Sequence, residues 1–136
     1  MAVIKELIRK ESNGTLSFGN YELDSKQKLS DFEFEGDLYK VKTFKEITKL
    51  EKNGKMLFES VPGATVHNFT MNERNIEFNV ESTEDVQITM ELEPEQEYKL
   101  IVDDMLVGKM ESNIAGKINF SVELGKNTAD VKIEKI

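Results

Sequence analysis

The sequence contains no cysteine and no tryptophan, and His67 is the one histidine among its 136 residues. Without cysteine the chain can form neither disulfide bonds nor thiolate metal sites, so a reducing compartment suits it. No apolar run approaches the roughly 18 residues that a membrane-spanning helix needs. Lys5 and Glu6 also interrupt the apolar residues near the N-terminus, where a secretion signal would lie. We therefore expect a cytoplasmic protein with no membrane partner.

Negative charge predominates, with 26 Asp and Glu residues against 18 Lys and Arg residues and a net charge of −8. A surface of this sign repels phosphate backbones, so we expect no nucleic-acid partner. The length fits one domain, which can bury roughly two thirds of the surface that its unfolded chain exposes. The sequence can therefore build a core without disulfides or metals.

Apolar and polar residues alternate with a period of two in several segments, as they do in half-buried strands. The alternation is clearest in residues 76–81, 86–92, 98–102 and 118–124, and residues 131–133 predict a C-terminal strand. Three dipeptides predict hairpin turns, because Asn, Asp and Gly tolerate positive φ. These are Asn13-Gly14, Asn53-Gly54 and Asp103-Asp104. The pattern predicts an all-β fold, either a β-sandwich or two packed antiparallel sheets, with at most one short helix.

Residues 43–53 allow two interpretations. Thr43 and Glu46 fit a helical capping box, with Gly54 as a C-cap, which predicts a short helix. The strand-like alternation of residues 39–43 and the Asn53-Gly54 pair instead predict a hairpin. Both alternatives stay open at this point.

The stretch Leu92-Glu-Pro-Glu-Gln-Glu-Tyr98-Lys-Leu-Ile-Val102 resembles a strand junction of fibronectin type III and related immunoglobulin-like sandwiches. The resemblance implies a tyrosine corner, in which the Tyr98 ring is buried and its hydroxyl bonds to nearby backbone. We expect residues 1–136 to form a single all-β domain with a possible sub-region boundary near residues 70–75. Residues 1–70 would then form an N-terminal hairpin region, and residues 76–136 an immunoglobulin-like sandwich region.

His67 follows Val61-Pro62-Gly63, which predicts a type II turn because Pro fixes φ and Gly accepts positive φ. A catalytic imidazole needs a nucleophile, and a metal-binding one needs further ligands. The chain has no cysteine, no second histidine and no nucleophile-elbow glycine pattern. We therefore expect a structural or exposed histidine, and His67 is only a weak functional candidate.

Two aromatic residues and two acidic pairs complete the weak candidates. Phe32 and Phe34 alternate with acids, so they fit either an exposed binding face or a buried strand edge. Glu84-Asp85 and Asp103-Asp104 lack the spacing of a calcium loop. We expect no catalytic residue, no cofactor and no metal, and hence no enzyme, with a glycoside hydrolase as the alternative.

A run of lysines stands out in this acidic chain, and it is the predicted interaction surface. Residues 40–55 contain only Glu46 and Glu51 as acids, against a set of lysines on a predicted strand or helix. The lysines are Lys40, Lys42, Lys45, Lys49, Lys52 and Lys55. Such lysines can protect an edge strand from aggregation, or they can dock an acidic partner.

The chain as a whole, notably residues 19–69 from "GNYELDSKQK" to "GATVHNF", resembles short uncharacterised bacterial proteins that are sometimes labelled endosialidase. That label implies a glycan-binding or glycan-processing accessory protein. Sialidases clamp the sialic acid carboxylate with arginines, whereas this chain has only Arg9 and Arg74. Our leading hypothesis is therefore a non-enzymatic β module that binds protein partners or self-associates, and the glycan role is the alternative.

Overall fold

The computed structural model describes residues 2–124 and 127–136. These residues form thirteen strands and no helix. The strands are β1 (Ile8–Lys10), β2 (Leu16–Phe18), β3 (Gln27–Phe34), β4 (Asp37–Phe44), β5 (Ile47–Lys52), β6 (Lys55–Val61), β7 (Thr65–Met71), β8 (Asn75–Glu81), β9 (Val86–Glu91), β10 (Glu97–Val102), β11 (Met105–Glu111), β12 (Lys117–Val122) and β13 (Thr128–Lys135). The predicted all-β class is confirmed.

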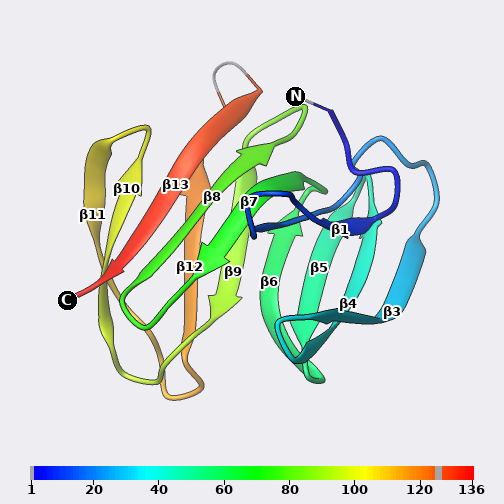
Figure 1. The fold of residues 1–136 in the computed structure, drawn as a ribbon. Coiled ribbons are helices and arrows are strands. Elements are labelled where there is room, and N and C mark those ends of the chain that lie inside the picture. The colour runs from blue at the N-terminus through cyan, green and yellow to red at the C-terminus, as the bar shows by residue number, and fades with distance from the viewer. Residues whose placement is uncertain (1, 125–126) are drawn as a thin grey trace.

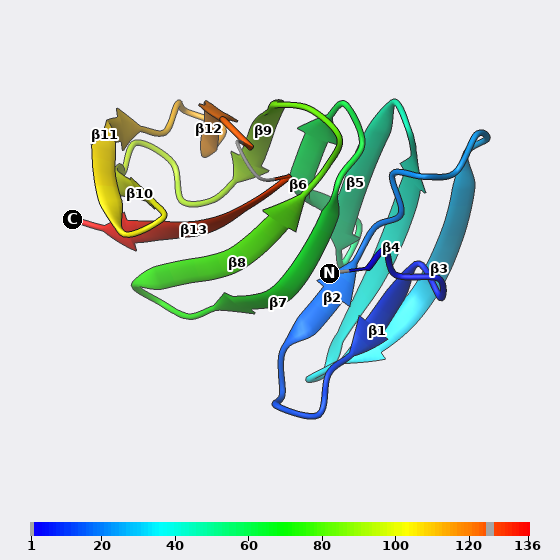
Figure 2. The same ribbon diagram turned by 90° about the horizontal axis from the view of Figure 1, so that it is seen from above.

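The strands form two antiparallel sheets that pack face to face (Figures 1 and 2). One sheet has seven strands in the order β1-β2-β7-β8-β13-β10-β11, and the other has six in the order β12-β9-β6-β5-β4-β3. This architecture confirms the predicted sandwich of two sheets. No helix long and apolar enough to cross a membrane occurs in the described part of the chain.

The Asn-Gly and Asp-Asp pairs lie at hairpin turns, as predicted. Asn53 and Gly54 have φ values of 52° and 83°, and they join β5 to β6. Asp103 and Asp104, at 51° and 64°, join β10 to β11. For residues 43–53 the structure selects the hairpin alternative and the helix is wrong, because a strand places Leu50 in the core opposite Phe58.

Aromatic rings from both sheets meet in the core. Phe18, Phe69 and Phe78 come from β2, β7 and β8, and Phe58 comes from β6 in the opposite sheet. The Phe58 ring centroid lies 5.4 Å from that of Phe18 and 5.7 Å from that of Phe78, both edge to face. Burying each ring contributes about 2 to 3 kcal/mol. This cluster therefore holds the two layers together.

The turn after β6 differs from the predicted type II turn. The Val61-Pro62 peptide bond is cis, and Gly63 does not have a positive φ. Gly63 instead lies against the β4–β5 turn, where its N–H donates to the Lys45 carbonyl at 3.0 Å. A Cβ at this position would lie 1.9 Å from the Phe44 carbonyl oxygen. The glycine is required for close approach between two backbones, which local turn chemistry does not reveal.

Residues 72–74 form the turn between the paired strands β7 and β8. Hydrogen-bonded strands join the regions on either side of this turn. In the seven-stranded sheet β2 pairs with β7 and β7 with β8, and in the six-stranded sheet β6 pairs with β9. Both regions thus contribute to both sheets and to one shared core.

Candidate functional site

His67 lies on β7 inside the protein, with only 6% of its surface exposed. Its Nε2 atom is 3.3 Å from Oε1 of Glu81 on β8. Burial lowers the pKa of His67 and outweighs the opposite effect of the Glu81 carboxylate. The imidazole is therefore neutral at pH 7, and its Nε2–H donates to Glu81.

The Glu81 carboxylate is held from its other side by Tyr21. The Tyr21 hydroxyl donates to Oε2 of Glu81 at 2.6 Å. Burial and then this hydrogen bond raise the pKa of Tyr21, so the phenol stays protonated. Tyr21 belongs to the segment that crosses from β2 in one sheet to β3 in the other. The His67–Glu81–Tyr21 group thus fixes this crossover.

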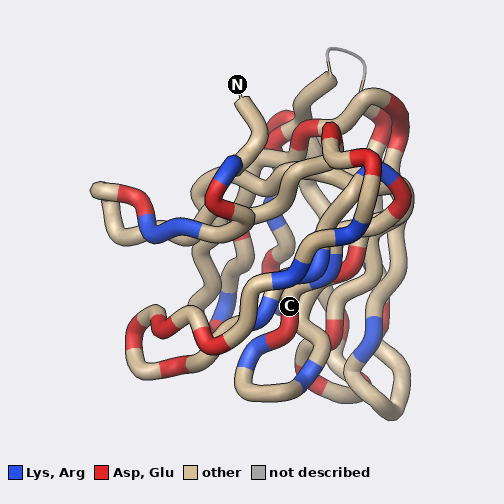
Figure 3. Tube along the Cα trace, turned by 90° about the vertical axis from the view of Figure 1, so that its right-hand side faces the viewer, with Lys and Arg blue, Asp and Glu red and all other residues tan. Residues whose placement is uncertain are grey.

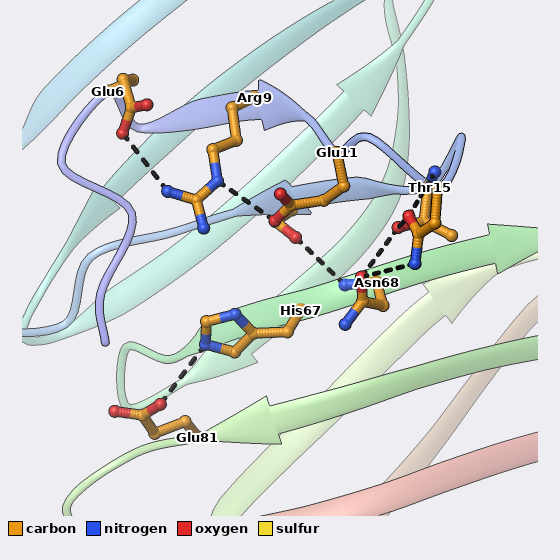
Figure 4. A network of polar contacts seen from close by, with 9 residues as sticks. Glu6, Arg9, Glu11, Thr15, His67, Asn68 and Glu81 are labelled. Atoms are coloured by element: carbon orange, nitrogen blue, oxygen red, sulfur yellow. Dashed lines mark hydrogen bonds and ion pairs between the residues drawn. The ribbon is translucent and has the colours of Figure 1, made fainter. Parts of the chain in front are cut away.

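A second polar network lies beside His67 on the β1–β2 hairpin (Figure 4). Arg9 Nε is 3.1 Å from Glu11, and the Ser17 hydroxyl accepts a hydrogen bond from the Asn68 N–H at 3.1 Å. The hydrogen bond from Ser17, and then the contacts with Arg9, lower the pKa of Glu11. Asn68 has a positive φ of 55°, at an irregularity in the pairing of β7 with β8. The hydrogen bond between Ser17 and Asn68 ties the β1–β2 hairpin to β7, and Arg9 and Glu11 pair with each other.

The other weak candidates also lie in structural positions. Phe34 is buried and its ring meets that of Tyr39 edge to face at 6.1 Å. Phe32 is partly buried and packs against the core. The buried-edge alternative thus describes Phe34, and neither ring forms an exposed stacking platform for a sugar.

Both acidic pairs contribute a carboxylate to a backbone hydrogen bond. Asp85 Oδ1 accepts from the Leu124 N–H at 2.8 Å, and Asp103 Oδ1 accepts from the Asp130 N–H at 2.9 Å. Among residues 2–124 and 127–136, no three histidine or acidic side chains are grouped as metal ligands. The two carboxylates therefore stabilise the structure by connecting neighbouring strands.

The six predicted lysines separate into two groups. Lys45, Lys52 and Lys55 lie in or next to the turns at the two ends of β5. Lys45 is 3.8 Å from Asp24, and Lys52 is 3.5 Å from Asp37. The remaining three lysines lie along the middle of β4 and β5, at Lys40, Lys42 and Lys49. The structure thus brings together half of the predicted stripe.

Lys28, Lys42 and Lys49 lie directly opposite one another on three adjacent strands. Lys28 on β3 pairs with Lys42 on β4, and Lys42 pairs with Lys49 on β5. Their neighbours Val41 and Leu50 point into the core, so these lysines occupy the outer face of the six-stranded sheet. Figure 3 shows Lys and Arg segments on neighbouring strands from the side of β3.

Partial burial lowers the pKa of Lys42, and the nearby charges of Lys26, Lys49 and Lys28 lower it further. Lys40 lies two residues from Lys42 and shares its side of the strand. We call Lys26, Lys28, Lys40, Lys42 and Lys49 the lysine face. The described part of the chain contains no ion pair to Lys42 or Lys49.

Two members of the lysine face were missed by sequence reasoning. Lys26 and Lys28 lie outside the run at residues 40–55, because Lys28 is on the preceding strand β3 and Lys26 comes just before that strand. The signal that could have found them is the Glu35-Gly36 turn, since a hairpin there folds residues 27–34 back along β4. The alternation in β3 is weak, and its pairing with β4 shifts between Leu29 and Phe32.

A pocket of about 480 Å³ lies at the end of the sandwich that carries the β7–β8 turn. Arg74 and Tyr98 are among its lining residues. The charged lining also includes Glu73, Glu91, Glu93 and Lys135, and Lys135 pairs with Glu93 at 2.7 Å. Acids outnumber bases here, which disfavours an anionic sugar. His67 is not among the lining residues, so Arg74 and His67 do not meet in this pocket.

Tyr98 is buried, and its hydroxyl accepts a hydrogen bond from the Glu93 N–H, as the tyrosine-corner pattern predicts. In comparisons with protein families, curated proteins and solved structures, no family model, protein or structure matches this chain. The resemblances to immunoglobulin-like domains and to endosialidase-labelled proteins stay predictions.

Proposed function

We propose that this chain is a non-enzymatic β-sandwich module that binds an acidic protein surface through its lysine face. The observation that supports this function is the row of Lys28, Lys42 and Lys49 on adjacent strands. An acidic partner complements this row in charge. An outward-facing sheet surface of this kind suits contact with another macromolecule more than it suits enclosure of a small substrate.

The energetics of the row favour a binding role. Like charges directly opposite each other on neighbouring strands destabilise a sheet. Partial burial, and then the charges of Lys26, Lys49 and Lys28, lower the pKa of Lys42, while Glu59 opposite Lys49 raises it. Carboxylates of a partner would attract these lysines and offset their mutual repulsion. The row is therefore more favourable beside an acidic partner than in isolation.

The non-enzymatic part of the proposal rests on His67 and its surroundings. A general base must reach a substrate proton within hydrogen-bond distance. The His67 ring is buried and directed at Glu81, and that carboxylate also holds the Tyr21 hydroxyl. These groups are used to fix the crossover between the sheets, which supports a structural role.

The test measures binding of polyglutamate, as an acidic polypeptide probe, by fluorescence anisotropy at low salt. The Lys42→Glu/Lys49→Glu variant should bind at least about tenfold more weakly, since each exposed charge contact contributes about 0.2 to 1 kcal/mol and both are reversed. Wild-type binding should weaken as salt rises to about 0.5 M, because the Debye length shortens.

The matched control is Lys5→Glu/Lys10→Glu, which changes the net charge equally at two exposed lysines near and on β1. This variant should retain most of the wild-type affinity. Equal losses in both variants would show that only net charge matters and would contradict a specific face.

A glycan role predicts a different outcome in the same assay. Polysialic acid is also a polyanion, but its recognition would depend on sugar groups as well as charge. Binding of polysialic acid that persists at about 0.5 M salt, with no binding of polyglutamate, would replace our proposal with the glycan alternative.

A further inference from the structure

Strand β11 forms one edge of the seven-stranded sheet and pairs only with β10 among the described strands (Figure 1, left). It carries three consecutive exposed apolar residues. Met105, Leu106 and Val107 are 72%, 62% and 61% exposed. An exposed apolar edge strand offers unpaired backbone groups for addition of another strand.

The other sheet edges carry features that discourage such addition. Strand β1 has only three residues, and β3 has an irregular register and three charged residues, Lys28, Asp31 and Glu33. Strand β12 exposes polar side chains at Lys117, Asn119 and Ser121. Short edges, bulges and charges are the usual protections. Strand β11 shares one of these features, because its pairing with β10 shifts between Leu100 and Ile101, but its residues 105–108 carry no charge.

The peptide groups of Lys109 and Glu111 face away from β10. The Ser112 N–H donates to the Gln96 carbonyl at 2.9 Å, so Ser112 bonds toward the interior of the sheet. In an antiparallel ladder, residues alternate between bonding to one neighbour and facing the other side. Lys109 and Glu111 therefore direct their N–H and C=O groups outward, where a further strand can bind them.

We propose that β11 pairs with β11 of a second copy of this chain, antiparallel, about a twofold axis at Met110. In this register Lys109 lies opposite Glu111 of the second copy, and Glu111 lies opposite its Lys109. Both pairs use outward peptide groups, and both join opposite charges. The interface is self-complementary, as a twofold dimer requires.

Charge excludes the neighbouring registers. Outward peptide groups recur every second residue, and a shift of one copy by two residues moves the twofold axis by one residue. The neighbouring registers therefore have their axes at Lys109 and Glu111. An axis at Lys109 places Lys109 opposite its own copy, and an axis at Glu111 places Glu111 opposite its own copy. Like charges directly opposite are unfavourable. Of these three registers, only the axis at Met110 is free of such a pair.

The same pairing continues the seven-stranded sheet across both copies. The exposed apolar residues Met105, Leu106 and Val107 precede Met110 on β11, and Ile114, which is 83% exposed, lies in the turn just after the strand ends at Glu111. Antiparallel pairing about Met110 therefore brings the apolar end of each β11 toward the turn that holds Ile114 of the second copy.

The test is sedimentation equilibrium of the whole chain at several concentrations. The wild type should be a dimer whose population falls on dilution. Lys109→Glu should weaken it by about tenfold or more, since it places acids opposite acids at two symmetric positions. The swap Lys109→Glu/Glu111→Lys should restore dimerisation, because it exchanges the partners and keeps the pairs. Val107→Lys should also weaken the dimer by adding a charge to the edge.

A monomer at all concentrations, or a dimer that Lys109→Glu leaves unchanged, would overturn the pairing of β11. Far-UV circular dichroism confirms that each variant is folded. Lys42→Glu/Lys49→Glu serves as the matched control and should leave this dimer unchanged, because the lysine face belongs to the other sheet. The two proposals can therefore fail separately.

Discussion

The hydroxyl of Tyr98 accepts a hydrogen bond from the backbone N–H of Glu93 at 3.2 Å. The ring of Tyr98 is buried at the start of β10. Burial raises the pKa of the Tyr98 phenol, so its hydroxyl remains neutral under ordinary conditions. This contact ties the loop between β9 and β10 to the end of the sandwich.

The two parts of Tyr98 should contribute separately to stability. Tyr98→Phe removes one hydrogen bond and should lower the free energy of unfolding by about 1 to 1.5 kcal/mol. Tyr98→Ala also leaves a cavity and should lower it by about 3 kcal/mol or more. Urea denaturation measures both. Small and equal losses in the two variants would indicate that the ring does not fill a packed site.

The buried His67 should make stability depend on pH. Its pKa in the folded protein is lowered from 6.5 by burial, so the unfolded chain binds a proton more readily. Above about pH 6.5 His67 is neutral in both the folded and the unfolded chain and does not oppose folding. As the pH drops below that value, protonation of His67 in the unfolded chain lowers the free energy of unfolding. Denaturation curves between pH 8 and pH 5 should show this loss.

The matched variant is His67→Gln, whose amide can still donate to Glu81 but does not titrate. It should lose less stability over the same pH range than the wild type. An identical pH dependence in the two proteins would exclude His67 as the source of the effect.

Gly63 should tolerate no side chain. Its missing Cβ would lie 1.9 Å from the Phe44 carbonyl oxygen, which belongs to backbone and cannot rotate away. Gly63→Ala should therefore destabilise the protein by about 1 to 3 kcal/mol or more. Gly108→Ala is the control, because within residues 2–124 and 127–136 no heavy atom beyond its two chain neighbours would lie within 4 Å of a Cβ at this position. Thermal unfolding should separate the two variants, and similar midpoints would contradict the predicted clash.

The sequence determined the elements whose cause is local. Alternating side chains specify strands such as β9 and β12, because a period of two places one face in the core. Asn53-Gly54 and Asp103-Asp104 determined their hairpins, because these residues adopt positive φ at low cost. Residues 43–53 remained ambiguous since helical and hairpin signals overlap there, and the pairing of β5 with β6, which places Leu50 in the core opposite Phe58, decided between them.

Only the tertiary structure decided which residues meet across the chain. The row of Lys28, Lys42 and Lys49 depends on strand registers that an irregularity in β3 shifts, and no local pattern fixes such a register. His67 is neutral because packing around β7 buries its ring. Glycine is needed at position 63 because the backbone of Phe44 and Lys45 lies against it. Local backbone preferences act within a few residues, whereas burial, register and close approach are set by packing of the two whole sheets.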